Sequence, residues 1–210
     1  MQDADVDTLS PICIAMDYNA NINWIVAGQY ESRFINVLQS FFVKYDRKLQ
    51  EVVKDFCHYY RHHMKKHVIY YYDSTALGSN YAVNDQDFAT VAEKTFNAHG
   101  WTVEMVNLGN PMKHQEKHML MDRWLKGQEG YTPRLNEENN EELIFALEST
   151  GIRVGANGFQ KDKSGEKLGE TEEDKLGYRT DGTDAFDTLV IGMNKEPRSV
   201  GSSFAGSFYL

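Results

Sequence analysis

Apolar residues along the chain form short continuous runs at the front and then recur at helical spacing. Three early runs, at residues 12–17, 23–30 and 34–43, predict strands joined by short connections, as in an antiparallel meander. The later runs "HVIYYYDST" and "WTVEMVNL" predict two more strands, because they are rich in β-branched and aromatic residues. The first run is almost entirely apolar, which is typical of a central strand covered on both faces.

Helical spacing predicts the elements between and after these strands. Helices are expected at residues 46–66, 84–100, 111–126 and 137–149, with a last one starting in "TDGTDAFDTLVIGM" at 180–193. Asp46 is interpreted as the N-cap of the first helix, and Met119 and Phe145 are among the apolar residues expected to pack. We therefore expect an α/β fold, a mixed β-sheet of about five or more strands covered by helices on both faces.

Three segments differ in character from this core domain, which is expected to span residues 12–196. Residues 155–179 are rich in glycine and charge, which predicts a long exposed loop or a hairpin turning at Ser164–Gly165. Residues 1–11 are acidic and polar and are interpreted as a linker, and residues 197–210 as a tail too small to form a domain.

Composition narrows the class of protein. A chain of 210 residues with 41% hydrophobic residues is large enough for one packed domain, and its net charge of −9 argues against a general nucleic-acid coat protein. Cys13 and Cys57 lie in apolar stretches and are expected to be buried free thiols. No apolar stretch is long enough to span a membrane and no signal peptide is recognisable, which together predict a cytoplasmic protein with no membrane contact.

Four aspartates form the strongest chemical pattern. Asp17 ends the first strand, Asp73 ends the fourth, and Asp184 opens the last helix with Asp187 one turn further on the same face. If strands one and four are parallel neighbours, these carboxylates meet at one edge of the sheet, where their repulsion requires a cation. Oxygen ligands suit Mg²⁺ or Mn²⁺, and two such ions promote phosphodiester hydrolysis. Any one of these acids taken alone is more often a turn former or a helix cap.

With these motifs in place, the sequence resembles the nuclease domain of phage large terminase subunits, within the RNase H-like superfamily. The resemblance covers the chain from Ile12 to Met193 and depends on "AMDYN", "YYYDST" and "TDGTDAFDTLVIGM" in that order. It implies that Asp17, Asp73 and Asp184 form a metal-binding catalytic triad that holds two ions, and it matches Asp187 to a further acid of the closing helix.

The closing motif departs from the family's pattern in one position. Thr183 stands where many members of the family have a second adjacent Asp. The departure leaves open which of Asp181, Asp184 and Asp187 completes the second metal site.

The resemblance also implies a function and partners. It implies an endonuclease that cuts double-stranded DNA during phage genome packaging, in a phage-infected or prophage-carrying bacterial cell. The partners would be an ATPase motor domain, whose phosphate-binding loop motif is absent from this sequence, together with a portal and a small terminase subunit.

Two groups of basic residues are candidate DNA contacts. The second group lies in the charged loop, in a region where the terminase family has a hairpin bordering the active site. Both groups are equally compatible with a solvated surface. The candidates are Arg61, Lys65, Lys66, Lys161, Lys163 and Lys167.

Two other readings of the acids stay open. The first is another RNase H-like enzyme, such as a junction resolvase or a transposase-like strand transferase. The second is a catalytically inert structural or docking domain in which the acids serve as caps. Preference for branched DNA would indicate the first, and absence of carboxylate-dependent Mn²⁺ binding the second.

Overall fold

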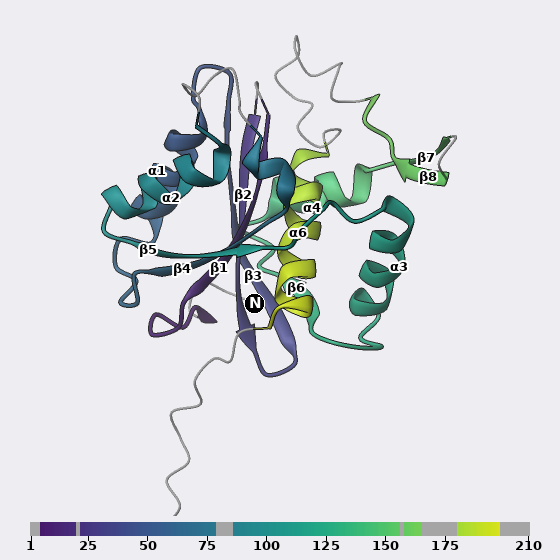
Figure 1. Ribbon diagram of the computed structural model, residues 1–210. Helices are drawn as coiled ribbons and strands as arrows, with labels where there is room; N and C mark the ends of the chain where they lie inside the picture. Colours follow the sequence, from purple (N-terminus) through teal and green to yellow (C-terminus); the bar gives the residue numbers. More distant parts are fainter. Residues whose placement is uncertain (1–4, 20–21, 79–85, 156–157, 165–179, 198–210) are drawn as a thin grey trace, which may run out of the picture.

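A mixed six-stranded sheet forms the centre of the computed structural model, which describes residues 5–19, 22–78, 86–155, 158–164 and 180–197 (Figure 1). The spatial order is β5-β4-β1-β2-β3-β6. β1, β2 and β3 pair antiparallel, whereas β4 and β5 run parallel to β1, and β6 runs parallel to β3. The predicted meander and mixed sheet are confirmed. The strands are β1 Ile12–Tyr18, β2 Ile22–Glu31, β3 Phe34–Lys44, β4 His67–Tyr72, β5 Thr102–Asn107 and β6 Thr132–Leu135.

Helices cover both faces of this sheet, as expected for an RNase H-like fold. In Figure 1, α1 and α2 lie on one side of the strands and α6, α3 and α4 on the other. A short 3-10 helix, η2, follows β4 directly. The helices are α1 Leu49–Tyr59, η2 Ser74–Leu77, α2 Phe88–Ala98, α3 His114–Leu125, α4 Glu141–Ser149 and α6 Asp181–Lys195. No helix of the described residues is long and apolar enough to cross a membrane.

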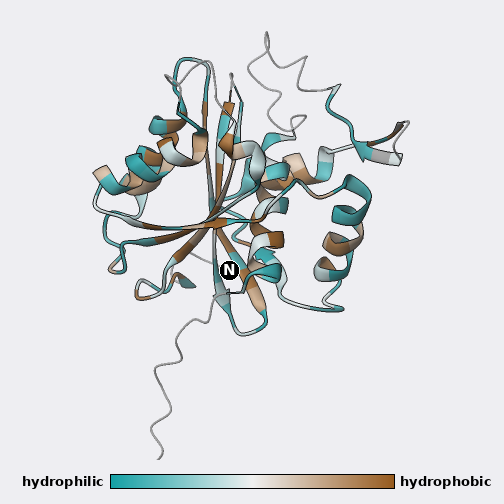
Figure 2. Cartoon of the chain, in the orientation of Figure 1, coloured by the Kyte–Doolittle hydropathy of each residue, from teal (hydrophilic) through white to brown (hydrophobic). Residues whose placement is uncertain are grey.

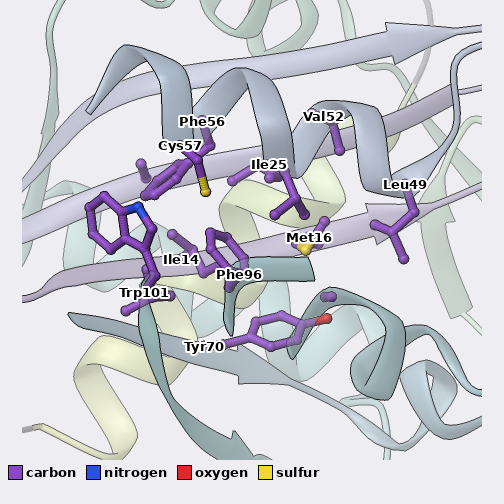
Figure 3. Close-up of a cluster of buried hydrophobic side chains, with 14 of the residues drawn as sticks. Ile14, Met16, Ile25, Leu49, Val52, Phe56, Cys57, Tyr70, Phe96 and Trp101 are labelled. Carbon is purple, nitrogen blue, oxygen red and sulfur yellow. The ribbon is translucent and has the colours of Figure 1, made fainter. Parts of the chain in front are cut away.

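The first core layer lies between the sheet and the helices α1 and α2. Alternate residues of β1 point to it, because side chains on a strand alternate between the two faces. Figure 3 shows Ile14 and Met16 among the side chains of this layer. Phe56 of α1, Phe96 of α2 and Trp101, which precedes β5, lie in the same layer. Figure 2 shows hydrophobic residues gathered along the central strands and hydrophilic residues more common on the outer elements. This burial fixes the register of β1.

The second core layer lies between the sheet and α6. Cys13 and Ala15 of β1 point to it, and Ala185, Leu189 and Met193 of α6 are buried against them, as predicted. α6 approaches the sheet closely because its surface toward β4 carries glycine. A Cβ at Gly192 would lie 2.3 Å from the ring of Tyr71 in β4. The closing helix is therefore held against the central strands, with its first turn over their ends.

The first and second helices have different bounds from those predicted. α1 begins after Lys48 and ends at Tyr59, so the predictions of Asp46 as its N-cap and of an end near Lys66 are wrong. The chain turns before β4, and the turn is closed by the ammonium of Lys66, which donates to the carbonyls of Tyr60 and Arg61. α2 begins at Phe88, and the predicted start at residues 84–85 lies outside the described residues.

Two predicted core residues are exposed instead. Met119 is 50% exposed and Phe145 is 48% exposed. α3 lies at the periphery of the second layer, where Met121 and Trp124 are buried and Leu120 is partly buried, whereas Met119 points away from this layer. The strand β6 was not predicted, because four residues that include Pro133 carry no period-2 pattern.

A hairpin extends from the α6 side of the sheet, near α3 (Figure 1). Its strands are β7 Ile152–Gly155 and β8 Gly158–Lys161, paired antiparallel. β7 ends at Gly155 opposite Gly158, the first residue of β8, and the predicted turn at Ser164–Gly165 runs into residues outside the described part of the chain. Most of the predicted charged loop lies outside the described residues.

The segment before β1 is docked on the domain. The side-chain amide of Gln29 donates to the carbonyl of Asp7 at 2.9 Å, and the backbone N–H of Lys65 donates to that of Thr8 at 2.9 Å. The tail after residue 197 lies outside the described residues.

Candidate metal centre

The register of two central strands sets Asp17 beside Asp73. β1 and β4 pair in parallel, with Ala15 opposite Tyr71, and the same register carried two residues further places Asp17 opposite Asp73. Both residues continue rows that face α6, because Ala15 and Tyr71 belong to the second core layer. Neighbouring strands lie about 4.8 Å apart, so the two carboxylates emerge side by side at the same edge.

The first turn of α6 brings a third carboxylate to this edge. Asp17, Asp73 and Asp184 all border one cavity of about 240 Å³. The backbone N–H of Asp184 donates to the carbonyl of Thr180, which starts the helix one turn before it. The structure thus brings together three acids that are far apart in the sequence, as the strand-end pattern predicted.

Asp73 has a second, local role. Its Oδ1 accepts from the backbone N–H of Thr75 at 2.9 Å and from the hydroxyl of Thr75 at 2.5 Å, so it caps η2. The cap orients the carboxylate where β4 ends. The alternative reading of this acid as a turn former is therefore correct as a local description, and it is compatible with Asp73 bordering the cavity.

The remaining acids of the closing helix lie elsewhere. The side-chain amide of Asn19 donates to Asp181, which is buried. Asp187 borders a smaller cavity of about 90 Å³, together with Lys117 and Lys161, and this cavity shares His114 and Lys117 with the three-acid cavity. Of the three acids left open by the sequence, Asp184 is the one that borders the cavity shared with Asp17 and Asp73.

Three lysines surround the carboxylate of Asp184. Lys161 lies 2.9 Å from its Oδ1, Lys163 lies 2.9 Å from its Oδ2 and Lys117 lies 3.4 Å from its Oδ1. Two of them also reach Asp187, Lys161 at 2.7 Å and Lys117 at 3.2 Å. Lys161 and Lys163 were predicted from the sequence as DNA contacts; Lys117, on α3, was not singled out, because only its position on a helix facing α6 reveals it.

These ion pairs determine the protonation states of Asp184 and Lys117. Burial by itself would raise the pKa of Asp184, but Lys161, Lys117 and Lys163 outweigh it and hold that pKa well below its ordinary value. Burial would likewise lower the pKa of Lys117, and Asp187 and Asp184 raise it above the ordinary value instead. Asp184 is thus a carboxylate and Lys117 an ammonium at neutral pH.

The other predicted basic residues lie apart from the acids. Arg61, Lys65 and Lys66 precede β4, whereas Asp73 follows it, so the six residues of the strand, about 20 Å, separate them. The ammonium of Lys66 is also placed 4.7 Å from the ring centroid of Trp101. A DNA contact at these three residues stays a prediction, on a surface separate from the carboxylates. Lys167 lies outside the described residues.

The two halves of this centre fit a divalent ion unequally. Asp17 and Asp73 line one cavity with carboxylates, the donors that Mg²⁺ and Mn²⁺ prefer, and the hydrogen bonds to Asp73 come from uncharged groups of Thr75. Asp184 and Asp187 have the same chemistry, but their oxygens are engaged by ammonium groups. In keeping with this, no three His, Cys, Asp or Glu side chains within the described parts of the chain are grouped as ligands of one ion.

A second cavity extends the first. It has a volume of about 420 Å³ and shares Asp73, Lys117 and Thr188 with the three-acid cavity, so the two adjoin. Lys113 and Lys195 line it, as do Glu116 and Glu196. Together the cavities form a polar trough that leads away from the carboxylates.

Comparison with known proteins gives the fold. No protein-family profile matches the sequence and no curated protein matches it. The large terminase of a thermophilic bacteriophage is similar in structure, with 12% identity and a TM-score of 0.57 over 90% of this chain and 41% of that chain. The fold is RNase H-like. The same terminase in complex with ATP-gamma-S gives a TM-score of 0.55, with 12% identity over 91% of this chain and 43% of that chain.

A third similar structure is the nuclease domain of the bacteriophage SPP1 large terminase with bound Mn. It is 13% identical and has a TM-score of 0.48, over 92% of this chain and 89% of that one. The chain spans about two fifths of the chains of the thermophilic phage terminase. At 12% identity, the similarity to the thermophilic phage terminase shows the fold alone, and this RNase H-like fold confirms the predicted fold class.

Proposed function

We propose that this chain is a metal-dependent endonuclease that hydrolyses DNA phosphodiesters, as the nuclease domain of a phage large terminase in genome packaging. One observation carries the proposal. Three carboxylates from separate elements, Asp17, Asp73 and Asp184, border one cavity at the end of the central strands. The fold shared with large terminases supports it, because it provides the same kind of scaffold.

The residues have distinct roles in this proposal. Asp17 and Asp73 would hold Mg²⁺ or Mn²⁺, and the bound ion would supply the charge for activating a water and stabilising the leaving oxygen. Asp184 keeps Lys161, Lys163 and Lys117 at the cavity, where their charge favours a phosphate. The water oxygen bonds to phosphorus as one phosphorus–oxygen ester bond breaks. The leaving oxygen takes up a proton, and the products are a phosphate monoester and a hydroxyl group.

The trough beside the cavity gives the DNA strand a path. Lys163 borders the three-acid cavity, and Lys113 and Lys195 border the adjoining one. In a chain whose net charge is −9, these lysines provide positive charge for sequence-independent backbone contact near the carboxylates, although Glu116 and Glu196 also line the adjoining cavity. The binding partner is double-stranded DNA. The ATPase motor, the portal and the small terminase subunit belong to the same proposal, which places the protein in the cytoplasm of the infected bacterium.

The direct test is nicking of a supercoiled plasmid in the presence of Mg²⁺ or Mn²⁺. Asp17→Asn and Asp73→Asn should each reduce nicking to background, since an amide removes the charge while keeping the shape of the side chain. Asp55→Asn is the matched control. Asp55 is an exposed acid on α1, outside the cavity, and forms an ion pair with Arg47. Equal nicking by the wild type and both cavity variants would refute the proposal.

Two further measurements separate the alternatives. Faster cutting of a four-way junction than of linear duplex would indicate a junction resolvase. Thermal denaturation with and without Mn²⁺ tests the inert domain, which should show no stabilisation dependent on Asp17 and Asp73.

A further inference from the structure

We propose that Lys161 is the built-in cation of the half-site formed by Asp184 and Asp187, so that only the half-site formed by Asp17 and Asp73 takes a divalent ion. The inference rests on the proposed function and deepens it, because it changes the expected number of ions from two to one. It concerns the described residues around α6, β8 and α3, whose contacts carry it.

Lys161 makes three polar contacts from a single ammonium. Its Nζ donates to the hydroxyl of Thr183 at 2.8 Å and lies 2.9 Å from Asp184 and 2.7 Å from Asp187. An ammonium has three protons to donate, so these three oxygens saturate it. The three acceptors lie on one face of the first turns of α6, as i, i+1 and i+4. They form a pocket for one small cation, which the lysine fills.

In this half-site, ammonium groups outnumber carboxylates. Asp184 and Asp187 contribute two negative charges, and Lys117 and Lys161 contribute two positive charges within ion-pair distance of both acids. Lys163 adds a third ammonium at Asp184. A divalent ion placed against the same oxygens would meet these like charges in a poorly solvated place, where their repulsion is only weakly screened.

The position of Lys161 is set by backbone structure as well. It is the last residue of β8 and pairs with Ile152 of β7, and the next N–H, of Asp162, donates to the carbonyl of Gly151 at 2.8 Å. The side chain of Lys161 is only 17% exposed and that of Asp187 only 9% exposed. The ammonium is thus placed by a paired strand beside a nearly buried partner, whereas the side chain of Lys126 is 58% exposed.

The half-site of Asp17 and Asp73 differs in the contacts of Asp73. Its two hydrogen bonds come from the backbone and the hydroxyl of Thr75, both uncharged donors. Asp17 lies next to it in the strand register, so two carboxylates meet there. Carboxylates this close repel each other, and a divalent ion between them converts that repulsion into a favourable contact.

The test is titration of the whole chain with Mn²⁺ by isothermal calorimetry at neutral pH. The wild type should bind one Mn²⁺, and Asp17→Asn should abolish that binding. Lys161→Gln, which keeps a hydrogen-bonding group without the charge, should add a second Mn²⁺ site at least about tenfold tighter than any second binding in the wild type. That added site should disappear in the double variant Lys161→Gln with Asp184→Asn. Thermal denaturation verifies that each variant is folded.

Lys126→Gln is the matched control. Lys126 is an α3-terminal lysine 2.7 Å from Asp122, an ion pair of the same length at an exposed place, and its loss should leave the stoichiometry at one. Two sites in the wild type, or one site in Lys161→Gln, would overturn the inference while leaving the proposed nuclease intact. No Mn²⁺ binding dependent on Asp17 would overturn both.

Discussion

The contact between Gly192 of α6 and Tyr71 of β4 gives a quantitative prediction for Gly192→Ala. A Cβ at residue 192 would lie 2.3 Å from Cγ and 2.5 Å from Cδ1 of Tyr71, where ordinary contacts begin at 3.4 Å. Either the helix or the ring must move by about 1 Å in a close-packed interior. The ring has little freedom, because Tyr71 is fully buried and its hydroxyl donates to the carbonyl of Glu196 at 3.2 Å.

The size of the effect follows from two opposing contributions to the free energy of unfolding. Overpacking a core costs about 1–3 kcal/mol, and this overlap belongs at the upper end. Alanine inside a helix recovers about 1 kcal/mol relative to glycine. The net expectation is a loss of about 2 kcal/mol, or a melting temperature about 4–8 °C lower in a chain of this length.

Thermal denaturation by circular dichroism measures this change. Gly151→Ala is the matched control, since its Cβ would meet only Asp162 Cβ at an ordinary 3.6 Å. Because Asp73 follows Tyr71 by two residues on the same face of β4, Mn²⁺-dependent stabilisation should weaken as well. A Gly192→Ala variant that melts at or above the wild-type temperature would show that α6 does not need this close approach.

Three other predictions follow from the same structure. In the folded protein, the pKa of Asp184 lies below its ordinary value of 3.8. The ion pairs of Asp184 therefore stabilise the fold fully above pH 3.8, and this stabilisation is lost as the pH falls through the folded pKa. Urea unfolding of wild type and Asp184→Asn should therefore differ by a constant amount from pH 8 to about 5 and converge only under stronger acid; convergence near pH 6 would contradict this. Burial raises the pKa of the Cys57 thiol to about 12, so a thiol reagent at pH 8 should label it only after unfolding, and rapid native labelling would count against that burial. Replacing Lys113 and Lys195 together by Gln should weaken binding to duplex DNA. It should also reduce the slope of log affinity against log salt concentration by the amount that about two phosphate contacts contribute, whereas Lys126→Gln should change neither quantity.

The strand-end acids were predictable because backbone periodicity determines where they lie. The apolar run of β1 marks a central strand, and period-2 alternation assigns Asp17 and Asp73 to rows whose earlier members are buried beneath α6. Parallel pairing of β1 and β4 then makes the two ends meet. The same reasoning fails for β6, which is short, contains Pro133 and is a strand only because β3 offers an edge.

Helix bounds and the hairpin were predicted less well, for a different reason. α1 stops at Tyr59 although the polar residues after it are compatible with a helix, because Lys66 and the segment before β1 tie the chain into a turn. The ends of an element depend on tertiary hydrogen bonds, and these are not visible in hydrophobic spacing. The strands β7 and β8 were not predicted at their own positions, because four residues each are too few to show a clear period-2 pattern.

The convergence of lysines on Asp184 and Asp187 was not predictable from the sequence, although the positions of the acids were. The place of an aspartate is set by the strand or helix that carries it, because its side chain is short. A lysine reaches across elements, so a chain with 22 Lys and Arg residues does not reveal that Lys117 and Lys161 converge on Asp184 and Asp187. Counting acids predicts two metal ions; counting the ammonium groups beside them predicts one. The electrostatics of such a centre are therefore determined as much by the cations that the fold supplies as by the carboxylates that the motifs display.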